Sequence, residues 1–255
     1  MKFFFKSCAL GLALCFFTFV SSVLIFFIPF STKRRILLIY WMHRCSRLIL
    51  RILDVHYWLE FRGSIEIKPG TLFLANHTSY IDVLLLSACY PSVFVTSQEV
   101  RSTPLLGWLA KASGCHFVER RNRSSLTTDI AAIREILQSG MNVVIFPEGT
   151  TSDGSGVLPF KKSLLAAAAS SPMEIRPVCI NYRLCEGEPV SKKVANLLFY
   201  FGDMHLITQI RHLLSVSEVL AEIVVLPALN PLDKSCRKSM AEAARSAICQ
   251  VFAPV

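Results

Sequence analysis

An uncharged run of 24 residues, from Ser7 to Phe30, constrains this chain more than any other feature. The run is rich in Phe, Leu and Val, and as a helix it would reach ~36 Å, against ~30 Å of bilayer hydrocarbon. The alternative is a cleaved signal peptide, because Lys2 and Lys6 precede the run. Its length and the basic residues that follow favour a transmembrane anchor with basic flanks over residues 1–35.

The positive charge is concentrated at the same end of the chain. The net charge is +9, and residues 1–70 hold ten Lys and Arg against three Asp and Glu. More of these cations follow the apolar run than precede it, which places the rest of the chain in the cytoplasm. A basic balance confined to one apolar end predicts membrane lipids as partners. No nucleic acid is expected, because that would need a basic patch on the folded domain.

A second apolar stretch covers residues 36–61 and has a different pattern. Arg44, Arg47, Arg51 and Asp54 recur at spacings of three and four, which gathers them on one helical stripe opposite a broad apolar face. This pattern predicts an amphipathic interfacial helix over residues 36–65. A core helix with a solvated arginine stripe would show the same pattern, so both interpretations stay open.

Residues 66–255 alternate short apolar runs with helical patterns, which predicts one α/β domain, an αβ sandwich with a mixed, largely parallel sheet. The expected strands are Thr71–Ala75, Ser92–Thr96, His116–Val118, Asn142–Phe146, Ile175–Asn181 and Leu220–Leu226. The expected helices are Tyr80–Cys89, Ser124–Ser139, Lys161–Ala169, Val190–Phe199 and Lys234–Phe252. The nine scattered cysteines contain no C-x-x-C pair, so we expect free thiols and no metal site. Dinucleotide, P-loop and nucleophile-elbow motifs are absent from the sequence.

His77 directly follows the first expected strand of this domain and stands five residues before Asp82. Sites in open α/β sheets lie beyond the carboxyl ends of strands, so His77 is well placed to do chemistry. If Asp82 lies in the first turn of the next helix, its carboxylate accepts from His77 Nδ1 and leaves Nε2 free as a general base. The competing interpretation is structural, because Ser79-x-x-Asp82 is also a capping-box pattern.

Two further segments carry groups that suit an anionic ligand. The strand ending at Phe146 leads into a turn rich in glycine and hydroxyls, Pro147-Glu148-Gly149-Thr150-Thr151-Ser152, which is either an anion-binding loop or an ordinary surface loop. Arg120 or Arg121, after the short strand His116–Val118, suits a phosphate. The alternative for either arginine alone is a solvated surface charge.

Together these segments resemble the glycerophospholipid acyltransferases, and most closely the 1-acyl-sn-glycerol-3-phosphate (lysophosphatidic acid) acyltransferase family. Asn76-His77-Thr78-Ser79-Tyr80-Ile81-Asp82 is similar to the family's N-H-x-x-x-x-D box, and Gly114 to Arg120 to its second block. Phe146-Pro147-Glu148-Gly149-Thr150 matches the third block, and Ile175-Arg176-Pro177-Val178 resembles the fourth. A lone H-x-x-x-x-D is a weak signal, but four blocks in the right order are a strong one.

The resemblance implies a role for each matched residue. His77 and Asp82 would be catalytic, and the acceptor alkoxide would attack an acyl thioester of coenzyme A or of acyl carrier protein, with no other cofactor. Arg120 would help bind the acceptor phosphate, and Pro177 would shape the pocket. Glu148, Gly149 and Thr150 would form part of the acceptor site. The expected product is phosphatidic acid, made at a bacterial inner membrane with the catalytic domain in the cytoplasm.

One departure from the family pattern bears on the acceptor. The family usually carries Arg after F-P-E-G-T, and this chain has Thr151. Either Lys161 and Lys162 supply the missing charge, or the acceptor is a different lysolipid such as lyso-ornithine lipid. Two other classes remain, a thioester or lipid hydrolase and an inactive membrane scaffold. The four blocks argue against the hydrolase, and the intact His77, Asp82 and Glu148 argue against the scaffold.

Overall fold

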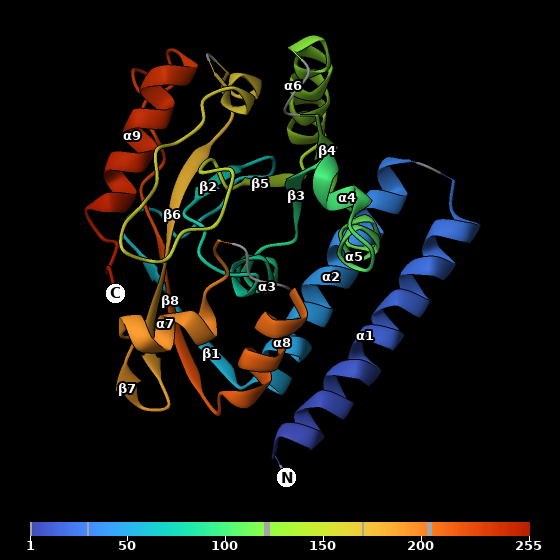
Figure 1. Ribbon diagram of the computed structural model, residues 1–255. Helices are drawn as coiled ribbons and strands as arrows, with labels where there is room; N and C mark the ends of the chain where they lie inside the picture. The colour runs from blue at the N-terminus through green and yellow to red at the C-terminus, as the bar shows by residue number, and fades with distance from the viewer. Residues whose placement is uncertain (1, 30, 120–122, 170, 203–205) are drawn as a thin grey trace.

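The computed structural model describes residues 2–29, 31–119, 123–169, 171–202 and 206–255 (Figure 1). Eight strands form one sheet in the order β1-β8-β6-β2-β5-β3-β4, and β7 pairs with β6. Their bounds are β1 Val55–Phe61, β2 Leu72–Ala75, β3 Ser92–Ser97, β4 His116–Val118, β5 Asn142–Ile145, β6 Ile175–Cys185, β7 Glu188–Pro189 and β8 Val219–Val225. Pairing is parallel from β6 across to β4, whereas β8 runs antiparallel to β6. The expected mixed, largely parallel sheet is confirmed.

Helices cover both faces of the sheet, and successive residues of a strand point to opposite faces, as a two-residue period requires. Phe73 and Ala75 of β2 pack into a core shared with α2, α3, α7 and α8. Leu72 and Leu74 pack into a second core shared with α6 and α9. The helices are α1 Lys2–Phe27, α2 Thr32–Leu53, α3 Ile81–Cys89, α4 Gln98–Ser102, α5 Leu106–Ala112, α6 Arg123–Gln138, α7 Lys192–Leu198, α8 Leu206–Ser215 and α9 Arg237–Cys249, with a 3₁₀ turn at Leu164–Ala167.

The helix α1 is long and apolar enough to cross a membrane, with a mean hydropathy of 2.4 over its most apolar window and only 17% of that window buried. It lies alongside α2, on the side of the molecule away from α9 (Figure 1). Near its N-terminus, Lys6 Nζ donates to Val216 O at 2.9 Å and to Leu53 O at 3.1 Å. Further along, Trp41 Nε1 of α2 donates to Phe17 O at 3.2 Å. The sequence prediction that α1 crosses a bilayer is not tested by the structure, and crossing would separate Lys6 from the carbonyls of Leu53 and Val216.

The helix expected over residues 36–65 ends early, and the prediction is wrong beyond Leu53. Asp54 adopts a left-handed conformation with φ of 62° and caps α2, and residues 55–61 then form β1. This segment pairs with β8 residue by residue, from Val55 opposite Val219 to Phe61 opposite Val225. The aromatic and β-branched residues of this segment suit a strand. It becomes one because it pairs with β8, which lies more than 150 residues further along the chain. The rest of α2 buries one face in the core, as the core-helix interpretation expects.

The helix expected over Lys161–Ala169 is also wrong, apart from the short 3₁₀ turn at Leu164–Ala167. Arg134 of α6 donates to the carbonyls of Ala166 and Ala167, which a continued helix would need as its own acceptors. At the start of the segment, Lys161 N donates to Pro147 O at 2.7 Å, and this hydrogen bond joins the segment to the loop after β5. Tertiary hydrogen bonds therefore override the high helix propensity of the alanine run.

Candidate active site

The carboxyl ends of β2 and β5 meet at one edge of the sheet, because these two strands are parallel neighbours. The chain leaves β2 as Asn76-His77 and leaves β5 as Phe146-Pro147-Glu148. Asn76 is buried and its amide exchanges hydrogen bonds with the backbone of Ile180 in β6, at 2.9 and 2.8 Å. This clamp fixes the point at which the chain turns from β2 toward His77.

His77 and Asp82 meet as the sequence predicts. His77 Nδ1 lies 2.9 Å from Asp82 Oδ2, and Asp82 is fully buried in the first turn of α3. Asp82 Oδ2 also accepts from the backbone N–H groups of Thr78 and Ser79, at 2.7 and 2.9 Å. The bond from Ser79 is one half of a capping box, so the catalytic and structural interpretations of Asp82 describe the same carboxylate.

A carboxylate acceptor on Nδ1 requires Nδ1 to carry the proton, which leaves a lone pair on Nε2. The ring of His77 stacks on Phe146 with centroids 3.9 Å apart and planes 13° apart, which fixes its direction. The His77 side chain is 17% exposed, and no hydrogen-bond partner of Nε2 occurs among the described residues. The arrangement therefore presents an oriented imidazole nitrogen whose lone pair can take a proton from a bound hydroxyl.

Tyr182 of β6 completes the surroundings of Asp82, and the sequence patterns gave no sign of it. Its hydroxyl donates to Asp82 Oδ1 at 2.6 Å, across 100 residues of sequence. Burial and the charge of Asp82 raise the pKa of Tyr182 well above its usual value, so the phenol stays protonated and donates. Asp82 thus accepts four hydrogen bonds, which hold its carboxylate in one orientation toward His77.

Glu148 connects the two loops at this edge of the sheet. One carboxylate oxygen accepts from His77 N at 2.7 Å, and the other accepts from Leu158 N at 2.9 Å. Only 2% of Glu148 is exposed, and burial raises the pKa of its carboxyl to about 7, against the opposing effect of these two hydrogen bonds. Glu148 therefore positions the backbone of His77, and both of its carboxylate oxygens accept hydrogen bonds from the backbone.

The remaining predicted residues lie in the loop after β5, in β6 and outside the described part of the chain. Gly149 has a positive φ of 73°, and a Cβ there would stand 2.7 Å from Lys161 Nζ, so the ammonium of Lys161 lies against the loop. Thr150 is exposed and Thr151 is half-buried in the same loop. Pro177 is buried in β6 opposite Leu74, where its carbonyl accepts from Leu226 N. The predicted phosphate ligand Arg120 lies outside the described residues.

Comparisons with known proteins identify the class of protein. A family model described as Acyltransferase matches residues 59–181, which include His77, Asp82 and the loop after β5. A lyso-ornithine lipid O-acyltransferase of Rhodobacter capsulatus is 35% identical over 207 residues, which cover 79% of this chain and 72% of the relative. A 1-acyl-sn-glycerol-3-phosphate acyltransferase of Neisseria meningitidis is 37% identical over 137 residues, 54% of this chain and 53% of the relative. The fold, the site and these relatives define an acyltransferase of the lysophospholipid type.

A solved structure shares the fold over nearly the whole chain. The crystal structure of the 1-acyl-sn-glycerophosphate acyltransferase PlsC from Thermotoga maritima superposes with a TM-score of 0.63 at 20% identity, and the match covers 98% of this chain and 92% of that one. The chain belongs to the glycerophospholipid acyltransferase family, as its four sequence blocks predict. Its relatives include both lysophosphatidic acid and lyso-ornithine lipid enzymes.

Proposed function

We propose that this enzyme transfers a fatty acyl group from acyl-CoA or acyl-ACP to the free hydroxyl of 1-acyl-sn-glycerol-3-phosphate, giving phosphatidic acid. The observation that carries the proposal is the His77–Asp82 contact at the carboxyl end of β2. His77 Nε2 takes the proton of the acceptor hydroxyl, and the resulting alkoxide attacks the thioester carbonyl. The tetrahedral intermediate then expels the thiolate, which receives the proton from His77. No covalent acyl-enzyme is needed, so no cysteine acts as a nucleophile.

The acceptor head group is the finer part of the proposal. The Lys161 ammonium beside Gly149 supplies one positive charge to the loop in which Thr151 stands where the family usually has Arg. A phosphate monoester carries nearly two negative charges and is held well by Arg, whereas a carboxylate needs less. Lyso-ornithine lipid is therefore a second candidate acceptor, supported by Thr151 and by the longer alignment with the Rhodobacter capsulatus relative.

One assay series tests the chemistry. Purified protein is given acyl-CoA or acyl-ACP with either acceptor, and both thiol release and lipid product are measured. His77→Ala is expected to lower transfer by ~10²–10⁴-fold, the usual contribution of a general base. His56→Ala is the matched control, because this exposed imidazole in β1 contacts Asp54 and not the site. Full activity of a folded His77→Ala protein would contradict the mechanism, and thiol release without lipid product would indicate a hydrolase.

The same assay with two further variants distinguishes the acceptors. If Lys161 compensates for the missing arginine, lysophosphatidic acid is the better acceptor and Lys161→Ala raises its KM. If the acceptor is lyso-ornithine lipid, the preference is reversed and Thr151→Arg shifts it toward lysophosphatidic acid. Equal use of both acceptors by all three proteins would mean that this loop does not select the head group.

We also propose that α1 attaches the enzyme to the membrane, with the catalytic domain in the bacterial cytoplasm. Its outer face presents Phe4, Phe5 and Phe26 at 74%, 73% and 83% exposure. The hydrogen bonds of Lys6 keep the N-terminal end of α1 against the same domain as its C-terminal end, so carrying residue 1 across the bilayer would break them. An N-terminal epitope in intact spheroplasts is expected to resist external protease. Its cleavage would show that α1 crosses the membrane.

A further inference from the structure

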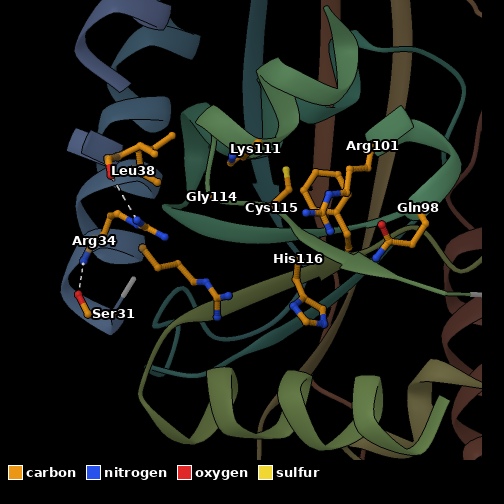
Figure 2. Close-up of a pocket in the computed structure, with 12 residues that line it drawn as sticks. Ser31, Arg34, Leu38, Gln98, Arg101, Lys111, Gly114, Cys115 and His116 are labelled. Carbon is orange, nitrogen blue, oxygen red and sulfur yellow. Dashed lines mark hydrogen bonds between the residues drawn. The ribbon is translucent and has the colours of Figure 1, made fainter. Parts of the chain in front are cut away.

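A cavity of about 400 Å³ lies beside β4, between the α1–α2 turn and the short helices α4 and α5. Three strand spacings separate β4 from β2, or ~14 Å, and His77 does not line the cavity. Figure 2 shows Arg34 and Leu38 of α2 on one side, Gln98 and Arg101 of α4 on the other, and His116 of β4 between them. The cavity is within the size range of small-ligand sites and separate from the proposed active site.

Its lining is strongly basic. Arg34, Arg35, Arg101 and Lys111 contribute to the wall, and the lining residues that the structure describes include no Asp or Glu. Two carboxylates act from α6 behind the wall, Glu135 on Arg35 and Asp129 on His116. Burial raises the pKa of the Cys115 thiol to about 12, so this lining residue brings no negative charge. The cavity therefore suits an anion, and guanidinium groups suit a phosphate in particular.

His116, in the wall of the cavity, carries a polar atom that the described residues leave unsatisfied. His116 Nε2 is buried and has no hydrogen-bond partner among the described residues. Burial and the nearby Arg35 lower the pKa of His116, which keeps the ring neutral. Buried polar atoms are nearly always satisfied, so this nitrogen would gain a partner if the ring turned toward an anion in the cavity. A neutral imidazole with hydrogen on Nε2 would donate to a phosphate oxygen.

The surroundings indicate where such an anion comes from. Ile25 forms part of the apolar wall, and the next two residues on α1, Phe26 and Phe27, are 83% and 73% exposed. On the neighbouring α5, which contacts α1, Trp108 is 38% exposed. The basic cavity thus lies next to the apolar surface that the proposed membrane attachment would bury.

We infer that this cavity binds the phosphate head group of an anionic phospholipid of the membrane. Arg35, Arg101, Lys111 and a turned His116 would contact the phosphate, while Arg34 keeps its bonds to the carbonyls of Ile25 and Ile28. Ile25, Leu38 and Phe117 would contact the glycerol and the first methylenes. A bound lipid there would hold the α1–α2 turn and the sheet edge at a fixed height on the bilayer. The inference rests on the proposed membrane attachment and is independent of which lysolipid is acylated.

Calorimetric titration of the full-length protein in non-ionic detergent tests this inference. The probe is dihexanoyl-phosphatidylglycerol, compared with dihexanoyl-phosphatidylcholine, inorganic phosphate and acyl-CoA. We expect one saturable site for phosphatidylglycerol, weakened roughly tenfold or more by Arg101→Gln/Lys111→Gln, which removes two charge-assisted contacts. Arg237→Gln/Lys238→Gln removes the same two charges from the exposed start of α9 and is expected to change the affinity by less than about twofold.

Three results would overturn the inference. The first is equal phosphatidylglycerol binding by the two double variants, and the second is equal affinity for phosphatidylcholine and phosphatidylglycerol in the unmodified protein. The third is a loss confined to acyl-CoA, which would make the cavity part of the donor site. Flotation on phosphatidylcholine vesicles tests the attachment itself, and acyl transfer measured on the same samples tests the reaction. Failure of either proposal is thereby distinguished from failure of the lipid site.

Discussion

Removal of the Tyr182 hydroxyl tests the arrangement of the proposed site most directly. Tyr182→Phe deletes the donor to Asp82 Oδ1 and leaves the buried ring beside Phe199 unchanged in shape. A hydrogen bond to a charged acceptor contributes ~1.5–3 kcal/mol, and the abandoned oxygen is fully buried. The unfolding free energy is expected to fall by that amount, which lowers the Tm by roughly 3–12 °C in a chain of this length.

The kinetic effect follows from the shared carboxylate. With one donor fewer, the charge of Asp82 is less offset and attracts the Nδ1 proton of His77 more strongly. The imidazolium is then stabilised, so the acidic limb of the pH–rate profile moves to higher pH, by up to ~1 unit for each 1.36 kcal/mol of added interaction. Activity at high pH changes less, because Asp82 still holds His77 through Oδ2.

A matched control is available in the same protein. Tyr90 is a second tyrosine whose hydroxyl is buried, stacked on Phe73, and without a hydrogen-bond partner in the described part of the chain. Tyr90→Phe removes an equal group and is expected to leave both the Tm and the pH profile unchanged or to raise the Tm slightly. If Tyr182→Phe behaves like Tyr90→Phe, the reasoning is refuted. A lower Tm with an unmoved acidic limb would leave Tyr182 with a structural role alone.

Three other substitutions test neighbouring parts of the structure. Glu148→Gln should flatten the pH dependence of stability: burial raises the pKa of Glu148 to about 7, so the folded protein holds a proton that the unfolded chain releases, and urea titrations should show stability falling by up to ~3 kcal/mol as the pH rises from about 4.5 to about 7. Gly149→Ala places a Cβ at positive φ and against Lys161 Nζ, so it should cost ~1–2 kcal/mol in chemical denaturation and raise the acceptor KM. Arg176→Met, which strips the buried Glu174 of its ion-pair partner and frees the carbonyls of residues 64 and 66, should cost ~3–5 kcal/mol, and a loss below 1 kcal/mol would contradict the burial argument.

The strands and helices around the site were predictable because local pattern and tertiary environment agree there. The strand His116–Val118 was predicted at its observed bounds, and β2, β5 and α3 within one residue. These segments are short, apolar and bounded by turn residues, so any buried parallel arrangement would select the same conformation. The helix prediction for residues 55–61 was wrong because their pattern suits both a helix and a strand. Only the pairing with β8 decides between the two.

The proposed site divides in the same way. The contact between His77 and Asp82 was predictable from their spacing, because His77 follows the end of a strand and Asp82 lies in the first turn of the next helix. The role of Tyr182 could not be predicted from nearby sequence, because its hydroxyl contacts Asp82 only when β2 pairs with β6. Arg176 was noted as part of a sequence block, but its role as a clamp on the chain before β2 depends on backbone carbonyls more than 100 residues away.

The sequence by itself therefore determined the fold class, the family and the His77–Asp82 pair, because each depends on periodicity or on residues a few positions apart. The tertiary structure alone decided which distant groups surround that pair, where α2 ends and where four cations gather beside β4. The physical reason is that buried hydrogen bonds and cavities are satisfied by whichever elements the topology brings together. Two segments adjacent in the sheet can be separated by any length of chain, and their pairing leaves no periodic trace in either.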